Sequence, residues 1–299
     1  MRIANLAGRL VVIDGAPGQE TATDVERASG GLFGPDPQAV YERWEEFTGW
    51  AADGLSASSL AAVGAEPGRF DLARLGPPVP LPRQVLAIGL NYGEHAAESG
   101  YAAPQSEPPV FTKFVSCLTG PFGDVTLPPG GHTDWEIELV AVIGRRAERV
   151  AAADALSYVA GFCAGQDLSE RVLQLAATPP QFSLGKSLPG FGPIGPWVVT
   201  LDELAGRADP GDLALSCSIN GAQVQTGRTS QMIFAVPELI ARLSAAMPLL
   251  PGDIIFTGTP PGVGLGRTPP VWLEDGDVLE SQIEGIGTMR HRFVASAGC

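Results

Sequence analysis

Apolar and polar residues follow one another in short blocks along most of this chain, and glycine or proline separates the blocks. Apolar runs of roughly four to eight residues between turn residues predict strands. The runs are VLAIGL, PVFTKF, IELVAVIG, YVAGFCAG, PWVVT, LALSCSING, DIIFTG and DVLESQIEGIG. Two helices are predicted among them, a short one over 93–99 and a second over 236–246. The pattern predicts an α+β fold that is predominantly β.

The first 75 residues have a different pattern of apolar and polar residues. RLVVID is typical of a strand, and DPQAVYERWEEFTGWAADGL repeats apolar residues at helical spacing. A proline-rich joint, GPPVPLPRQ, follows over 76–84. We therefore expect a small N-terminal domain over 1–75 and a larger domain over 76–299.

Composition restricts the function classes. Hydrophobic residues make up 44% of 299 residues, enough for a substantial core, and 38 Gly and 27 Pro favour a turn-rich β architecture. A net charge of -14 argues against nucleic-acid binding. We recognise neither a membrane span nor a signal peptide. The four cysteines lack metal-ligand spacing and are expected to be reduced thiols in the cytoplasm.

The segment HTDWEIELVAVIGR places two glutamates at the start of an apolar run. Side chains alternate between the faces of a strand, so Glu136 and Glu138 share one face opposite a wholly apolar one. Neighbouring carboxylates on a half-buried strand repel each other unless a positive charge compensates. A hard divalent cation would supply that charge, because carboxylate oxygens suit Mg²⁺, Mn²⁺ or Ca²⁺. On spacing alone, two ordinary glutamates at an exposed strand edge are the alternative.

A third acidic residue, Asp167, ends the predicted strand YVAGFCAGQD. An aspartate at a strand end can reach a neighbouring strand, where it would complete a three-carboxylate site with Glu136 and Glu138. Capping of a helix that begins near Ser169 is the alternative. The spacing leaves both interpretations open.

From about Val85 to Phe293 the chain resembles the fumarylacetoacetate hydrolase family, and in particular its acylpyruvate hydrolase-like members. The matching blocks occur in the family's order: IGLNYGEHAAE, PPVFTKF, DWEIELVAVIG, QDLSERVLQ, GKSLPGFGPIGPWVVT, INGAQVQTGRTSQMIF, LLPGDIIFTGTPPGVG and EDGDVLESQIEGIG. The resemblance implies a mixed β-sandwich or roll core, a variable N-terminal domain and a homodimer. It also implies a Mg²⁺ or Mn²⁺ ion held by Glu136, Glu138 and Asp167.

His95 and Glu98 lie three residues apart in NYGEHAAE and would share one face of a helix. A carboxylate beside an imidazole raises its basicity and fixes its tautomer, so the pair could take a proton from water near the metal. From spacing alone, the alternative is an incidental pair on a surface helix. The resemblance favours catalysis, because the family places its water-activating His–Glu dyad on a lid at these positions.

The resemblance also implies substrate contacts. Lys186, one of only two lysines, matches the family's active-site lysine, whose cation can hold a substrate oxygen that becomes negative. Gln174 matches a substrate-contacting glutamine. Thr259 and the backbone of Gly258 match the TGTP turn, which can donate hydrogen bonds to substrate oxygens.

Five further residues have no assigned part in the chemistry. Arg171 is expected to be structural and to pair with an acidic neighbour, whereas the second lysine, Lys113, either lines the site or caps a strand. We interpret His132 as a loop residue and His291 as a solvated strand residue. Val172 replaces the acidic residue usual in the family after the arginine, which leaves the metal assignment intact but bears on substrate preference.

The favoured function is metal-dependent hydrolysis of a C–C bond in a β-dicarbonyl acid, such as an acylpyruvate or fumarylpyruvate, through a metal-stabilised enolate. Two alternatives use the same site. One is decarboxylation of a β-keto acid such as oxaloacetate, and the other is isomerisation of an unsaturated dicarboxylate of the 2-hydroxyhepta-2,4-diene-1,7-dioate type. A non-catalytic metal-binding scaffold is a remote alternative, because His95, Glu98 and Lys186 are all present.

Overall fold

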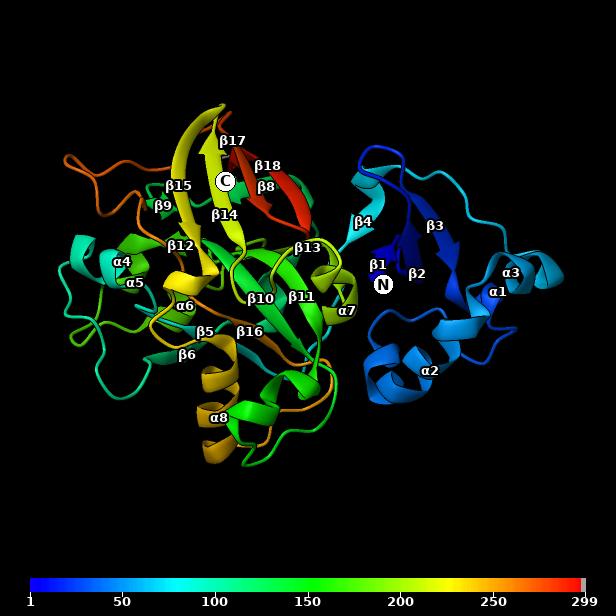
Figure 1. Ribbon diagram of the computed structural model, residues 1–299. Coiled ribbons are helices and arrows are strands. Elements are labelled where there is room, and N and C mark those ends of the chain that lie inside the picture. The colour runs from blue at the N-terminus through cyan, green and yellow to red at the C-terminus, as the bar shows by residue number, and fades with distance from the viewer. Residues whose placement is uncertain (297–299) are drawn as a thin grey trace.

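Every strand predicted after residue 84 is present in the computed structural model, which describes residues 1–296 (Figure 1). Within this part of the chain the larger sheet has eleven strands. Their order is β3 (Thr21–Asp24), β2 (Arg9–Asp14), β1 (Arg2–Leu6), β13 (Gly192–Val199), β11 (Val159–Gln166), β10 (Ile137–Ile143), β16 (Ile254–Phe256), β5 (Val85–Ile88) and β6 (Val110–Thr112), with β4 (Leu75–Gly76) on β1 and β7 (Leu118–Thr119) on β13. The α+β, predominantly β fold class is thus confirmed.

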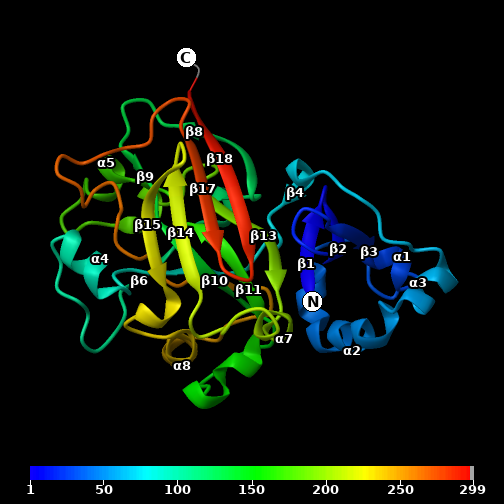
Figure 2. The same cartoon turned by 45° about the horizontal axis from the view of Figure 1, so that its top comes forward.

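A second sheet lies over the first, as Figure 2 shows. It contains, in order, β15 (Ala222–Arg228), β14 (Ala214–Ile219), β17 (Val278–Ile283), β18 (Gly287–Ala295) and β8 (Phe122–Leu127). A two-stranded ladder joins β9 (Thr133–Asp134) to β12 (Ser169–Glu170) beside the sheets. The predicted sandwich core corresponds to the space between the two larger sheets.

Helices are short and lie around these sheets. The α-helices are α1 (Val25–Ala28), α2 (Trp44–Gly54), α3 (Ala57–Val63), α4 (Gly93–Glu98), α5 (Arg171–Gln174), α6 (Phe182–Gly185), α7 (Leu201–Ala205) and α8 (Val236–Ala246). The 3₁₀ turns are η1 (Ala39–Arg43), η2 (Leu72–Arg74), η3 (Val115–Cys117), η4 (Ala152–Tyr158) and η5 (Thr229–Gln231). The two helices predicted in the larger region are α4 and α8. Within residues 1–296, no helix has the length and apolar character needed to cross a membrane.

Strand β10 is buried on both faces, which is more burial than its pattern predicted. Ile137 and Leu139 belong to the core shared with the second sheet, whereas Val140 packs in a separate core that includes Trp44 and Phe47 of the N-terminal region. The apolar face was therefore predicted correctly, but the strand is not half-buried. The glutamates at its start consequently lie inside the protein.

The N-terminal region is joined to the larger sheet by strand pairing. Arg2 and Ile3 of β1 lie opposite Val199 and Val198 of β13. Figure 1 shows this region in blue and cyan at one side of the molecule. We propose residues 1–75 as a separate small domain on composition and on the proline-rich joint, although β1 extends the sheet of the larger region.

His291 is buried, so its interpretation as a solvated strand residue was wrong. Strand β18 lies between β17 and β8, and the side chain of His291 points inward with those of Met289 and Phe293. Its Nε2 lies 3.0 Å from the carbonyl oxygen of Gly120, and its Nδ1 has no hydrogen-bond partner among the described residues. Burial lowers the pKa of His291 to about 4.

Replacing His291 with glutamine is expected to make the protein less sensitive to acid. His291 binds a proton near pH 6.5 in the unfolded chain and only near pH 4 in the folded chain. Protonation of the unfolded chain therefore costs no stability above pH 6.5, and the protein loses stability as the pH falls from 6.5 toward 4. Urea unfolding at pH 7.5 and pH 5 should show that the wild type loses about 2 kcal/mol more than His291→Gln. Equal losses in the two proteins would contradict this account.

Candidate active site

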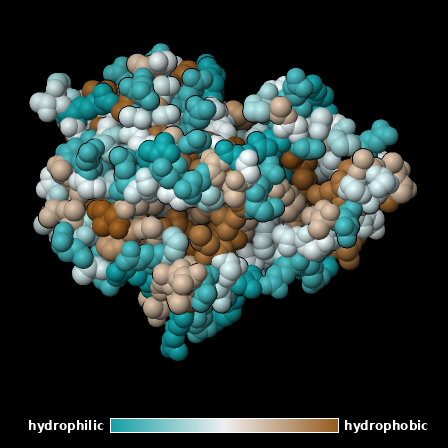
Figure 3. Space-filling view, viewed as in Figure 1, coloured by the Kyte–Doolittle hydropathy of each residue, from teal (hydrophilic) through white to brown (hydrophobic). Residues whose placement is uncertain are grey.

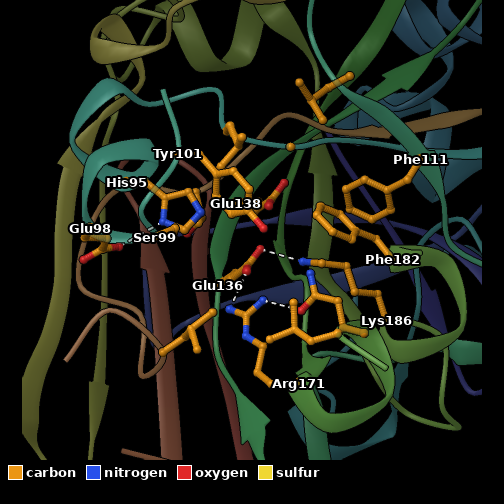
Figure 4. Close-up of a pocket in the computed structure, with 17 residues that line it drawn as sticks. His95, Glu98, Ser99, Tyr101, Phe111, Glu136, Glu138, Arg171, Phe182 and Lys186 are labelled. Atoms are coloured by element: carbon orange, nitrogen blue, oxygen red, sulfur yellow. Dashed lines mark hydrogen bonds and ion pairs between the residues drawn. The ribbon is translucent and has the colours of Figure 1, made fainter. Parts of the chain in front are cut away.

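Three buried carboxylates meet where β10 begins and β11 ends (Figure 4 shows two of them). Glu136 directly precedes β10, Glu138 is its second residue, and Asp167 directly follows β11. The pairing of Ile137 with Gln166 brings the two strand ends together, and one oxygen from each carboxylate lies within 4.8 Å of the others. Asp167 does not cap the following helix, since the carboxylate of Glu170 caps α5.

Both lysines of the chain are buried against this cluster. Lys186 Nζ lies 2.6 Å from Asp167 Oδ2 and 2.8 Å from Glu136 Oε2. Lys113 Nζ lies 2.7 Å from Asp167 Oδ1 and also donates to the backbone carbonyl groups of Lys186 and Phe191. Lys113 therefore compensates the negative charge of Asp167. The sequence alone left open whether Lys113 lines the site or caps a strand.

Arg171 connects the cluster to a fourth carboxylate, Asp134. Its Nη2 lies 2.7 Å from both Glu136 Oε1 and Asp134 Oδ2, and its Nη1 donates to Gln174 Oε1 at 2.8 Å. Asp134 also accepts the backbone N–H groups of Gly264 and Leu265. Sequence reasoning paired Arg171 with an acidic residue but missed Asp134, although alternation along DWEIE places it on the same side as Glu136.

Charge is unevenly compensated within the cluster. Burial alone would raise the pKa of Glu136, but the cations of Lys186 and Arg171 hold it well below its usual range. Glu138 has the opposite shift, because burial and the charges of Asp167 and Glu136 raise its pKa. Among the described residues, its carboxylate accepts only the N–H of Gly258, at 2.7 Å.

The donor set fits a hard divalent cation. Three carboxylates supply oxygen ligands, and Glu138 is a buried acid without a cationic partner at hydrogen-bond distance among the described residues. Gly258 contributes through its backbone: its φ is +98° and a Cβ there would lie 2.6 Å from the Cβ of Asn91. Glycine thus permits the close approach through which this N–H reaches Glu138.

His95 and Glu98 face the carboxylates from α4. His95 Nδ1 lies 2.9 Å from Glu98 Oε1, and the N–H of Gly262 donates to both oxygens of Glu98. Buried Asn91 anchors the chain just before α4, since its side chain donates to the carbonyl oxygens of Phe234 and Thr257. With Nδ1 turned toward Glu98, Nε2 is the imidazole nitrogen left to exchange a proton.

These groups line one cavity of about 290 Å³, near the lower end of the usual size range for ligand pockets. The predicted residues on its wall are His95, Glu98, Glu136, Glu138, Gln174, Lys186 and Thr259. Figure 4 labels all of these except Gln174 and Thr259. Asp167 and Gly258 lie just behind this wall in contact with it. The N–H of Gly258, proposed for substrate, is donated to Glu138. Thr259 lines the cavity, and its hydroxyl donates to the carbonyl oxygen of Ile137 and accepts from Gln225.

Two other predicted positions lie away from the cavity. His132 stacks on Trp272, with ring centroids 4.8 Å apart, and does not line the cavity. Val172 is 51% exposed and is not part of the wall. The unusual valine therefore leaves every contact among the carboxylates, lysines and Arg171 in place.

Replacing Lys113 with methionine is expected to destabilise the protein by ~3–5 kcal/mol, because it removes one partner from a fully buried ion pair. Urea unfolding measures the change in the free energy of unfolding. Arg146→Met is the matched control: Arg146 and Glu148 form an exposed pair whose loss should cost under ~1 kcal/mol. Equal effects of the two substitutions would show that Asp167 does not depend on Lys113.

Comparison with known proteins identifies the family. The model of the fumarylacetoacetate (FAA) hydrolase C-terminal domain matches residues 84–294, which include every element of the site. The chain belongs to the fumarylacetoacetate hydrolase family. The matched range begins at the last residue of the proline-rich joint, and members of this family are enzymes.

One relative described here matches about three quarters of the chain, and another matches almost all of it. Human oxaloacetate tautomerase FAHD2A, named as mitochondrial, is 43% identical over 218 residues, which cover 73% of this chain and 68% of that protein. A candidate HpcE protein from Mycobacterium smegmatis has a crystal structure that matches with a TM-score of 0.89 and 49% identity over 99% of this chain and 100% of its own. The family fold expected from the sequence is thereby confirmed.

One solved relative bears on the metal. Maleylpyruvate hydrolase from Sphingobium sp. SYK-6, solved with manganese(II) and pyruvate, matches with a TM-score of 0.77 and 29% identity, and the match covers 99% of this chain and 100% of that one. A divalent metal site built from the buried acidic triad agrees with that finding.

Proposed function

We propose that this family member is a divalent-metal-dependent hydrolase that cleaves a C–C bond in an acylpyruvate-type β-dicarbonyl acid. The observation that carries the proposal is the meeting, in one cavity, of the acidic cluster with the His95–Glu98 pair. We further propose Mg²⁺ or Mn²⁺ as the cofactor and a homodimer as the working assembly. The cytoplasmic location stays a prediction.

Glu136, Glu138 and Asp167 would hold the cation. When bound, it supplies positive charge that stabilises negative charge developing on substrate oxygens. Lys186 adds a permanent cation beside the same position: burial would lower its pKa, but Asp167 and Glu136 raise it. Lys186 therefore stays protonated and can donate to a substrate oxygen, together with the side-chain N–H of Gln174 on the wall. Thr259 is proposed as a further contact, whose hydroxyl would exchange its hydrogen bond to Ile137 for one to substrate.

His95 acts as the general base in this proposal. Its Nε2 accepts a proton from water, and Glu98 stabilises the resulting imidazolium through Nδ1. The water oxygen adds to the distal carbonyl carbon, and the bond from this carbon to the adjacent methylene carbon then breaks. That electron pair stays with the pyruvate part, whose methylene carbon takes up a proton. The products are a carboxylic acid and pyruvate.

A second candidate function is supported by the relatives. FAHD2A is named as an oxaloacetate tautomerase, and a crystal structure from Mycobacterium abscessus, 28% identical with a TM-score of 0.80, is described as a probable 2-hydroxyhepta-2,4-diene-1,7-dioate isomerase. Both reactions move a proton at a carbon next to a carbonyl group. His95 could perform that transfer without adding water, and decarboxylation of oxaloacetate would use the same cavity.

The test is a substrate panel on metal-stripped protein, with Mg²⁺ or Mn²⁺ restored. Hydrolysis of acetylpyruvate predicts pyruvate and acetate in equal amounts, and only with metal present. Conversion of enol to keto oxaloacetate without acid products would favour the tautomerase candidate, and release of CO₂ would favour decarboxylation. Metal binding without turnover of any panel member would contradict an enzymatic role for the site.

A further inference from the structure

We infer that the cavity selects 2-oxo acids whose far end is apolar over those that carry a second carboxylate. This inference rests on the proposed function, because it takes the 2-oxo acid head of the substrate to lie at the carboxylate cluster. The remainder of the substrate then meets the charged and apolar side chains that line the rest of the cavity.

The cations of the cavity wall are already paired. Arg171 binds Asp134, Glu136 and Gln174, and Lys186 binds Glu136 and Asp167. Among the lining residues that the structure describes, no lysine or arginine is left without a carboxylate partner. A second substrate carboxylate would have to compete with buried protein carboxylates for these groups.

The local charge also disfavours a dianion. At the cavity and directly behind it lie five carboxylates, those of Glu98, Asp134, Glu136, Glu138 and Asp167, and three cations, those of Lys113, Arg171 and Lys186. One divalent cation would balance this set and leave no positive surplus. The first substrate carboxylate, at the cluster, therefore already gives the site one excess negative charge, and a second would add another and would face Glu98 or an apolar wall.

The wall away from the cluster is apolar and partly aromatic. Phe111 of β6 and Phe182 of α6 form an edge-to-face pair with centroids 5.5 Å apart, and Figure 4 shows them beside Lys186 and across the carboxylates from His95. Further apolar and aromatic lining comes from Ile88, Leu90, Tyr101, Leu175 and Leu265, and Ser99 is an uncharged polar residue of the wall. Around α5 and α6, apolar residues reach the surface as well (Figure 3). Apolar walls bind apolar substrate groups by removing both surfaces from water.

Two isosteric probes test this selection without requiring turnover. 2-Oxoglutarate and 5-methyl-2-oxohexanoate share the 2-oxo acid head and chain length, but the first ends in a carboxylate and the second in an isopropyl group. Calorimetric titration of the manganese-loaded protein should give a Kd about tenfold lower for the apolar probe. Pyruvate, the shared head, measures binding at the cluster alone.

Substitutions in the wall distinguish binding at the apolar wall from binding at the carboxylate cluster. Phe182→Ala should raise the Kd of 5-methyl-2-oxohexanoate about fivefold and leave that of pyruvate unchanged. Leu184→Ala is the matched control on the same helix, because Leu184 is 63% exposed and does not line the cavity. Leu175→Arg adds the missing cation and should lower the Kd of 2-oxoglutarate roughly two- to fivefold.

The outcomes separate this inference from the proposed function. If 2-oxoglutarate binds the wild type as tightly as its isostere, the inference is overturned, while the proposed function stands as long as pyruvate binds. An unchanged Kd for the apolar probe in Phe182→Ala also overturns it. Failure of the manganese-loaded protein to bind pyruvate would remove the proposed function and the inference together.

Discussion

Replacing His95 with alanine is expected to lower kcat by a factor of ~10²–10⁴ and to leave the affinity for Mn²⁺ unchanged. The proton acceptor is lost, whereas the three carboxylates are contributed by the start of β10 and the end of β11 and do not depend on α4. Steady-state kinetics on the panel substrate measure kcat, and titration of the metal-stripped protein measures Mn²⁺ affinity.

His132→Ala is the matched control for this prediction. His132 lies outside the cavity and stacks on Trp272, so its removal should change kcat by less than about twofold. Full activity in the His95 variant would show that another group accepts the proton. A parallel loss of Mn²⁺ binding would instead mean that the substitution disturbs the carboxylate cluster.

Replacing Glu138 with glutamine is expected to abolish stabilisation by metal without weakening the metal-free protein. Wild-type protein should gain about 2.7 kcal/mol of stability at a Mn²⁺ concentration one hundred times Kd. Burial and the neighbouring acids already raise the pKa of Glu138, so a neutral amide suits this position when no cation is bound. Urea unfolding with and without Mn²⁺ measures both effects.

Asp167→Asn should behave differently from Glu138→Gln. Asp167 is the shared partner of Lys113 and Lys186, and removing its charge leaves two buried cations undercompensated. The metal-free variant should therefore be less stable by ~3–5 kcal/mol. Exposed Glu148 supplies the control, since Glu148→Gln should change neither the stability of the metal-free protein nor its stabilisation by Mn²⁺. Stabilisation of the Glu138 variant by Mn²⁺ to the wild-type extent would contradict the three-carboxylate site.

The residues of the site were largely predictable because their spacing is set within single elements. Alternation along a strand places Glu136 and Glu138 on one side, and the three-residue spacing on α4 turns His95 toward Glu98. The strands of the larger region were predictable for the same reason, since apolar runs bounded by glycine and proline report local backbone preference. Position at a strand end made Asp167 a candidate ligand, and resemblance to the family decided between that role and helix capping and gave Lys186 its role.

The sequence by itself determined the strand pattern, the acidic pair and the His–Glu spacing, all of which are properties of neighbouring residues. Only the tertiary structure decided which charges meet: Lys113 is 54 positions from Asp167, and Arg171 is 37 from Asp134, so no local period relates them. It also decided that His291 is buried, because β18 lies between two other strands. Charge compensation and burial depend on how distant segments pack, and a residue's own neighbours along the chain do not specify that.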